Sequence, residues 1–290
     1  MQATKSNTLR VPGATLYHEV RGSGPVLLLI CGGVYDAAGY AALGERLADR
    51  YTVVTYDRRG NSRSPLDGPP APQRIEVHGD DAHRLLMAVG VTAGERAHVF
   101  GNSSGAMIGL ELAARHPEQV RTLVAHEPPL FELLPDRDYW RAAIRRVEDT
   151  FRKEGAGAAM QALGAAFASS GNATPNTEGR MPGGREAPHD EPDPETMAMM
   201  VRLQKNMEFF IGSEVPPFNT YVPDFAALQP STVCIVLAVG EASEGEPPYR
   251  AALAVAERLG TRAAVFPGDH GGFGNQAEAF AVKLHEVLSR

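Results

Sequence analysis

The sequence is poor in three features, and each shortage excludes a class of protein. Two cysteines in 290 residues are too few for a small secreted scaffold held by disulfides. Lysine and arginine number 28 against 35 aspartates and glutamates, so the net charge of −7 argues against a phosphate-binding surface for nucleic acid. No apolar run approaches the roughly 18 residues that a membrane-spanning helix needs.

Two smaller absences bear on location and redox state. Residues 1–10 contain no basic segment followed by an apolar one, so we expect a cytoplasmic protein. Cys31 and Cys234 both fall in apolar runs, where a free thiol behaves as a small hydrophobic side chain. We therefore expect two buried thiols and no disulfide.

Strand-like and helical runs alternate through residues 1–130 and again through residues 227–290. The runs VLLLI and TVVTY are apolar throughout, as strands covered by helices on both faces must be. The runs SNTLRV and ATLYHEV are typical of an antiparallel edge. The pattern predicts one α/β core with a mostly parallel, doubly wound sheet.

Residues 131–226 differ from the rest because they contain helical periods and no strand-like run. Apolar residues recur at helical spacing through 140–151 and again through 200–210, which predicts two amphipathic helices. Between them, residues 171–195 are rich in glycine and proline, and we expect a mobile loop there. The segment is predicted to be a helical cap inserted into the core.

A Gly-x-Ser-x-Gly pattern lies between a predicted strand and a predicted helix. Gly101, Ser103 and Gly105 form it, and the small flanking residues allow a turn tight enough to expose the central hydroxyl. Ser103 is therefore the candidate nucleophile, and the backbone N–H of Ser104 is a candidate oxyanion donor. The alternative is a glycine-rich turn with a bystander serine.

A serine nucleophile needs a base, and His270 is the candidate. It lies in the loop FPGDHGGF after the last predicted strand, where a histidine follows the serine in chain order. Gly32 and Gly33 follow the strand VLLLI, and their backbone N–H groups are candidates for the rest of the oxyanion hole. The charged stretch YDRRGNSRSP is predicted to hold a loop-bracing ion pair.

Together the CGG turn, YDRRGNSRS, the GNSSG elbow, the inserted cap and the PGDHGGF loop resemble the α/β-hydrolase fold family over nearly the whole chain. The resemblance implies acyl transfer by a serine, an acid and a histidine, with no metal or cofactor. Two positions depart from it. Cys31 stands where many members have a histidine, and Ser243 stands about where the family's aspartate usually falls.

Three glutamates could replace that aspartate, namely Glu127, Glu241 and Glu244. Glu127 ends the strand VRTLVAH at the carboxyl edge of the sheet, where active-site groups gather in open α/β folds. Fungal lactone hydrolases that open zearalenone are similar in placing a glutamate there, with an SSGA elbow and a His-Glu pair before proline. Haloalkane dehalogenases are similar in that placement but use an aspartate nucleophile. The resemblance favours Glu127.

The sequence thus predicts a carboxylic ester hydrolase for a small apolar ester or lactone, working through Ser103, His270 and Glu127. Val34, Met207 and Phe210 are candidate substrate contacts. No nucleic-acid or membrane partner is expected, and a homodimer is compatible with the sequence. The rival hypothesis is a protein that keeps the fold without hydrolysis, such as a lyase, a cyclase or a ligand-binding receptor.

Overall fold

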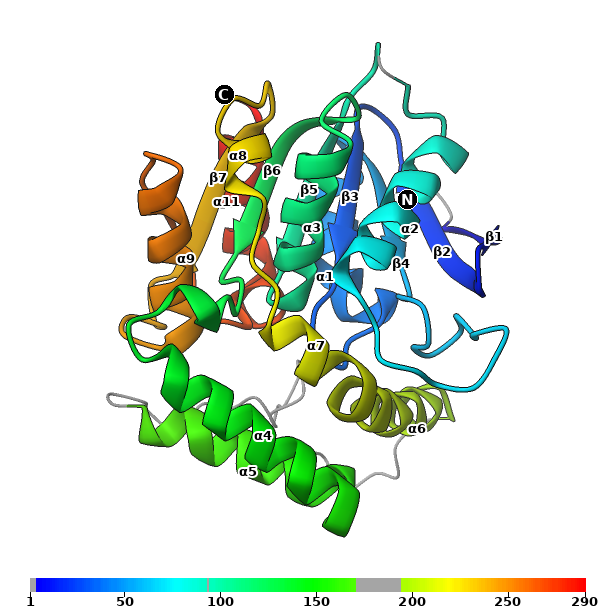
Figure 1. Cartoon of the computed structure of the whole chain (residues 1–290). Coiled ribbons are helices and arrows are strands. Elements are labelled where there is room, and N and C mark those ends of the chain that lie inside the picture. Colours follow the sequence, from blue (N-terminus) through cyan, green and yellow to red (C-terminus); the bar gives the residue numbers. More distant parts are fainter. Residues whose placement is uncertain (1–3, 93, 171–193) are drawn as a thin grey trace.

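The computed structural model describes residues 4–92, 94–170 and 194–290. An eight-stranded sheet forms its centre (Figure 1). The strands are β1 (Lys5–Val11), β2 (Ala14–Gly22), β3 (Val26–Ile30), β4 (Thr52–Tyr56), β5 (Ala97–Asn102), β6 (Val120–His126), β7 (Cys234–Gly240) and β8 (Ala264–Phe266). Their order across the sheet is β1-β2-β4-β3-β5-β6-β7-β8.

The sheet is parallel except at one edge. β1 pairs with β2, and β2 with β4, in antiparallel register, whereas every pair from β4 to β8 is parallel. Because parallel strands share a direction, the carboxyl ends of β3, β5, β6, β7 and β8 lie side by side at one end of the strands, which we call the carboxyl edge of the sheet. The predicted α/β class with a mostly parallel sheet is confirmed.

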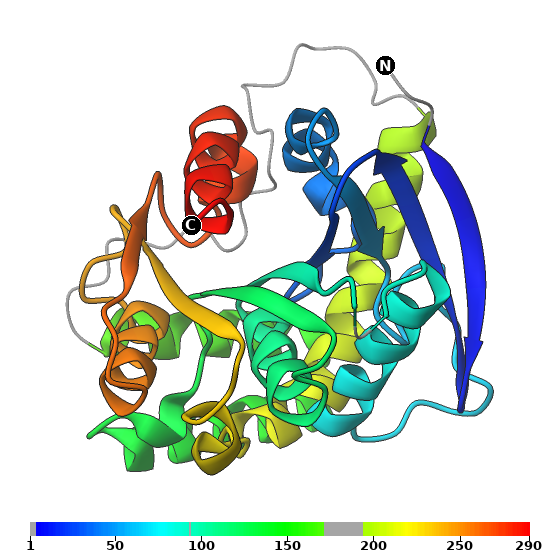
Figure 2. The same cartoon turned by 90° about the horizontal axis from the view of Figure 1, so that it is seen from above.

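Helices cover both faces of the sheet, and Figure 2 shows them on either side. α1 (Ala41–Leu47) and α11 (Ala277–Leu288) lie on one face; α2 (Ile75–Ala88), α3 (Ser104–Arg115) and α9 (Pro247–Arg258) lie on the other. In β3, Leu27 and Leu29 enter one core cluster while Leu28 and Ile30 enter the other. This alternation explains why the run VLLLI has no polar residue, since both of its faces are buried.

Between β6 and β7, the described residues form five α-helices, a 3₁₀ turn at Phe131–Leu133 and a π-helical turn at Phe210–Glu214. The helices are α4 (Arg137–Glu154), α5 (Ala156–Ser169), α6 (Pro194–Phe209), α7 (Val215–Asn219) and the short α8 (Phe225–Leu228), which leads back to the sheet; α10 (Gly272–Asn275) follows β8. Figure 1 shows α4 and α5 side by side across one end of the molecule. We call residues 131–226 the cap segment, and its status as a separate domain stays a prediction.

Helix α5 is the main element that the sequence pattern missed. Its residues, AGAAMQALGAAFAS, are mostly small, so no polar face alternates with a large apolar one. It is nevertheless held by aromatic packing, because Phe167 lies 5.2 Å from Trp140 of α4, ring centre to ring centre. The predicted loop at 171–195 falls, up to residue 193, outside the described residues.

Two further sequence expectations meet the structure here. Cys31 is buried, but Cys234 is exposed, so the expectation of two buried thiols was wrong for Cys234. It begins β7, and the buried part of that strand starts three residues later. Among the described residues, no helix combines the length and the apolar character that crossing a membrane requires.

Candidate active site

Ser103 occupies a sharp turn between β5 and α3. Its backbone φ of 54° lies in a region that residues other than glycine rarely adopt. The turn leaves no room for side chains around it: a Cβ on Gly101 would come within 2.3 Å of the carbonyl oxygen of Gly105. A Cβ on Gly105 would come within 2.1 Å of the carbonyl oxygen of Ile30. The glycines of the motif are therefore required by the geometry that presents the Ser103 hydroxyl.

His270 and Glu127 are in direct contact, although Glu127 directly follows β6 and His270 lies in the loop after β8. His270 Nδ1 donates to Glu127 Oε2 at 2.6 Å, and the backbone N–H of Gly240 donates to Glu127 Oε1 at 2.8 Å. Glu127 is fully buried, and its φ of 47° is also left-handed. Both carboxylate oxygens therefore have a donor, and the side chain is held in one orientation.

The environment of Glu127 favours its charged form. Burial alone raises the pKa of a carboxyl group. The hydrogen bonds from His270 and from the N–H of Gly240 more than offset this burial, so the pKa of Glu127 lies below its ordinary value. The group facing His270 Nδ1 is thus a carboxylate, which accepts hydrogen bonds and does not donate them.

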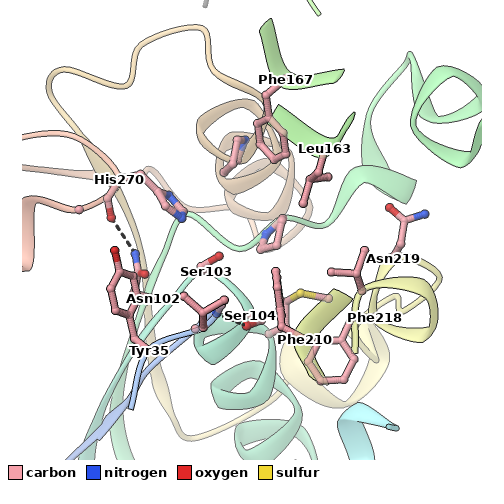
Figure 3. Close-up of a pocket in the computed structure, with 18 of the residues that line it drawn as sticks. Tyr35, Asn102, Ser103, Ser104, Leu163, Phe167, Phe210, Phe218, Asn219 and His270 are labelled. Carbon is pink, nitrogen blue, oxygen red and sulfur yellow. Dashed lines mark hydrogen bonds between the residues drawn. The ribbon is translucent and has the colours of Figure 1, made fainter. Parts of the chain in front are cut away.

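Ser103 and His270 line the same cavity. In Figure 3 the His270 ring points toward the Ser103 hydroxyl. Because Nδ1 of the ring is bound to Glu127, the ring presents its opposite edge to the cavity. The three residues chosen from the sequence are thus brought to one edge of the sheet.

Asn102, the residue before Ser103, connects the His270 loop with His126 through its side chain. It was not identified from the sequence. Its side-chain Nδ2 donates to the carbonyl oxygen of His270 and to Nδ1 of His126, both at 3.0 Å. Burial lowers the pKa of His126 to about 4, so this ring is neutral and can accept at Nδ1. Asn102 could not be recognised from sequence because both contacts depend on the pairing of β5 with β6 and on the return of the His270 loop.

The predicted oxyanion residues also lie at this edge. Gly32, Gly33 and Ser104 line the cavity with Ser103. Ser104 is the first residue of α3, so its N–H has no acceptor within the helix. The N–H of Gly33 donates to Ser104 Oγ at 3.0 Å. One predicted donor is therefore oriented by its helix, and the other is held by a neighbouring hydroxyl.

A buried ion pair connects the oxyanion turn with the cap segment. Arg58 Nη2 donates to the carbonyl oxygen of Gly33 at 2.5 Å, and Nη1 donates to Glu214 Oε1 at 2.7 Å. Both charged side chains are fully buried. Glu214 ends the π-helical turn that precedes α7. The sequence predicts a loop-bracing pair among Asp57, Arg58 and Arg59. Asp57 pairs instead with Arg63 of the same stretch. Arg59 pairs with Asp81 of α2, and Arg58 reaches out of its loop to the cap segment.

No hydrogen bond among the described residues joins Glu241 or Glu244, the rival acids, to the imidazole of His270. Glu241 and Glu244 are exposed, and Glu241 Oε1 accepts from the N–H of Gly268 at 3.2 Å. Ser243 is fully buried, and within the described part of the chain its hydroxyl has no hydrogen-bond partner. The carboxylate that the structure places against His270 is that of Glu127.

The cavity above Ser103 is walled mainly by apolar side chains. Val34 and Phe210, two of the predicted substrate contacts, line it, whereas Met207 is not among its described lining residues. Figure 3 shows the labelled wall residues converging on the space above Ser103. The large apolar lining residues are Val34, Met107, Phe131, Ile144, Met160, Leu163, Phe167, Phe210, Val215, Phe218 and Phe273.

Two groups among the described residues could offer three ligand atoms to a metal ion. One is His126, Glu127 and His270, but both Glu127 oxygens already accept hydrogen bonds there. The other is His83, His116 and Glu118, away from the cavity, where the two imidazole rings stack in parallel at 3.8 Å. Parallel rings do not direct their lone pairs to one point. Neither group has the arrangement of a ready metal site.

Comparisons with known proteins find relatives that share this fold. A model described as the alpha/beta hydrolase fold matches residues 25–208. The uncharacterized hydrolase YraK of Bacillus subtilis is 38% identical over 290 residues, covering 98% of this chain and 96% of YraK. A thermophilic esterase from Thermogutta terrifontis superposes with a TM-score of 0.69 at 21% identity, over 100% of this chain and 98% of the esterase. The enol-lactonase from Burkholderia xenovorans superposes with a TM-score of 0.69 at 20% identity, over 98% of this chain and 100% of the lactonase.

Proposed function

The chain belongs to the alpha/beta hydrolase fold family, with a hydrolase among its relatives, and we propose that it is a serine hydrolase acting on an ester or lactone of an apolar small molecule. One observation carries the proposal. A buried carboxylate, Glu127, lies 2.6 Å from His270, whose ring lines the same cavity as the strained serine, Ser103. This is the arrangement of nucleophile, base and orienting acid that acyl transfer requires.

In the proposed reaction, Ser103 Oγ attacks the carbonyl carbon, and His270 Nε2 takes the hydroxyl proton. Glu127 holds the ring by Nδ1 and stabilises the imidazolium. The bond between the former carbonyl carbon and the leaving-group oxygen of the substrate then breaks. His270 gives its proton to that oxygen, which leaves an alcohol group and an acyl-enzyme on Ser103. Water attacks the acyl group in the second half, with His270 again as base, and releases the acid and free Ser103.

Negative charge on the carbonyl oxygen would be stabilised by the N–H groups of Ser104 and Gly33. The N–H of Ser104 begins α3, where the helix dipole also favours an anion. The N–H of Gly33 is held by Ser104 Oγ, so its contribution requires that hydroxyl to rotate away from it. Arg58 donates a hydrogen bond to the carbonyl oxygen of Gly33 and so keeps the turn in place.

The apolar wall of the cavity supports a substrate with a hydrocarbon or aromatic body. Two structures with a similar fold are named as an esterase and an enol-lactonase. The SSGA elbow and the His126-Glu127-Pro128 sequence add the resemblance to zearalenone-type lactone hydrolases. These observations support an ester or lactone as substrate, with no cofactor needed for the steps above.

The proposal is tested by turnover of a panel of nitrophenyl esters and macrolactones by the wild type, Ser103→Ala and His270→Ala. We expect hydrolysis of at least one substrate by the wild type and its loss in both variants, with unchanged circular dichroism and melting temperature. Hydrolysis by Ser103→Ala at the wild-type rate would refute the serine mechanism. A wild type that binds these ligands and leaves all of them intact would favour the non-hydrolytic alternative.

A further inference from the structure

One polar side chain in the apolar part of the cavity wall has no explanation within the protein. Asn219, the last residue of α7, lines the cavity and is 8% exposed. Its Oδ1 is buried, and no group in the described part of the chain donates a hydrogen bond to it. In Figure 3 this side chain lies across the cavity from His270. A buried amide oxygen without a donor costs free energy, so a partner supplied from outside the protein would explain its presence.

The chain holds Asn219 in a fixed place. Helix α7 starts directly after Glu214, whose carboxylate accepts from Arg58 Nη1 at 2.7 Å and from Asn61 Nδ2 at 3.2 Å. Pro216 and Pro217 lie within α7 and restrict its backbone. The amide is therefore carried by a short, rigid segment that is anchored to the core. The contacts of Glu214 with the core therefore set the distance between the Asn219 amide and Ser103.

We propose, building on the serine hydrolase function above, that Asn219 accepts a hydrogen bond from a donor group at the far end of the substrate. The donor is a hydroxyl, carried on an apolar body whose other end presents the scissile carbonyl to Ser103. Because both ends are fixed, the site selects substrates by the distance between the carbonyl and the hydroxyl. A site with a buried acceptor rejects an analogue that lacks the donor, since binding then leaves the acceptor unpaired.

Two series of nitrophenyl or acetate esters test this assignment. In one, the acyl chain ends in methyl, hydroxyl or methoxy at graded lengths; in the other, the alcohol chain of an acetate ester carries the same three ends. For the wild type we expect, in one series and at one chain length, a kcat/KM for the hydroxyl compound about tenfold or more above that of the methyl and methoxy compounds. The methoxy compound separates donation from mere polarity, because it can accept a hydrogen bond but not donate one.

The matched variant is Asn219→Leu, which keeps the size of the side chain and removes the acceptor. It should lose the hydroxyl preference, mainly through a raised KM for the hydroxyl compound, so that its kcat/KM for the hydroxyl and methyl compounds becomes about equal. Asn275→Leu is the control, because Asn275 also lines the cavity but is exposed. Its hydroxyl preference should match that of the wild type.

The proposal is overturned if the wild type shows no hydroxyl preference in either series, if methoxy equals hydroxyl, or if Asn219→Leu keeps the preference. The wild-type comparison decides the matter even if Asn219→Leu fails to fold. Failure of this proposal leaves hydrolysis of the methyl compounds intact. Failure of the serine hydrolase function would abolish turnover of every compound, so the two failures are distinguishable.

Discussion

Glu127 Oε2 lies 2.6 Å from His270 Nδ1, although 143 residues separate the two in the chain. The contact forms because Glu127 directly follows β6 and His270 lies in the loop after β8, so both reach the same edge of the parallel sheet. The N–H of Gly240, at the end of the intervening strand β7, fixes the second carboxylate oxygen. The proposed acid therefore follows β6, one strand before the position where the family resemblance places an aspartate, and β7 contributes a backbone donor.

Neutralising this acid should remove most of the activity. Glu127→Gln keeps an amide oxygen for one donor but cannot stabilise the imidazolium, and it can impose the wrong tautomer on His270. We expect kcat to fall by about 10³ to 10⁴, the scale seen when a triad acid is replaced by its amide. Steady-state kinetics on the best ester from the panel measures this, and the melting temperature should change little.

The rival glutamates provide the comparison. Glu241→Gln and Glu244→Gln affect exposed side chains, and each should lower kcat less than about tenfold, a barrier change under ~1.4 kcal/mol. If Glu244→Gln were the crippling substitution and Glu127→Gln benign, the acid would lie after β7. The resemblance to the lactone hydrolases would then fail at its most informative residue.

Breaking the buried pair between Arg58 and Glu214 should destabilise the protein. Arg58→Met leaves the Glu214 carboxylate without its main partner in a fully buried place, and we expect a loss of about 3 to 5 kcal/mol in the free energy of unfolding. Urea unfolding measures it. The double variant Arg58→Met with Glu214→Leu should recover part of the loss, because no unpaired charge remains. A single-variant loss near zero would contradict a buried pair.

The buried ring of His126 makes stability depend on pH. Its folded pKa of about 4 lies below the ordinary value near 6.5, so between these values the unfolded chain binds a proton that the folded chain does not. The free energy of unfolding should therefore fall as pH falls from about 6.5 to about 4, with about 3 kcal/mol from this group.

His126→Asn, which keeps an acceptor for Asn102 but does not titrate, provides the comparison for this pH effect. Urea unfolding of both proteins between pH 4 and 7 should show a smaller pH dependence in the variant. Other buried histidines, such as His98 with its pKa lowered to about 4, titrate equally in both proteins. Parallel pH profiles for the two would show that His126 is not the group responsible.

Local patterns were enough to predict the sheet and the elbow. The run VLLLI had to be covered on both faces because it lacks any polar residue, and the glycines around Ser103 indicated a turn that only small residues allow. These are properties that a few neighbouring residues determine together. Glu127 follows a strand at the carboxyl edge, but it was favoured over Glu241 and Glu244 only with the help of the family resemblance.

The missed features depend on contacts between distant segments. Arg58 and Glu214 are 156 residues apart, and neither shows in its own segment that the other will neutralise it. Helix α5 lacks a large apolar stripe, so its position is set by the packing of Phe167 against Trp140. Phe210 lines the cavity and Met207 is not among its described lining residues, a difference set by the rotation of α6 and of the turn after it.

The central claim, that Ser103 is the activated nucleophile, is tested most directly by labelling with a fluorophosphonate and mapping the adduct by peptide mass spectrometry. The probe requires an activated serine but no known substrate. We predict one adduct per chain, on Ser103 and not on the adjacent Ser104, abolished by Ser103→Ala and slowed by Glu127→Gln, while Ser104→Ala still labels. An adduct on Ser104, or a folded wild type that resists the probe, would contradict the account.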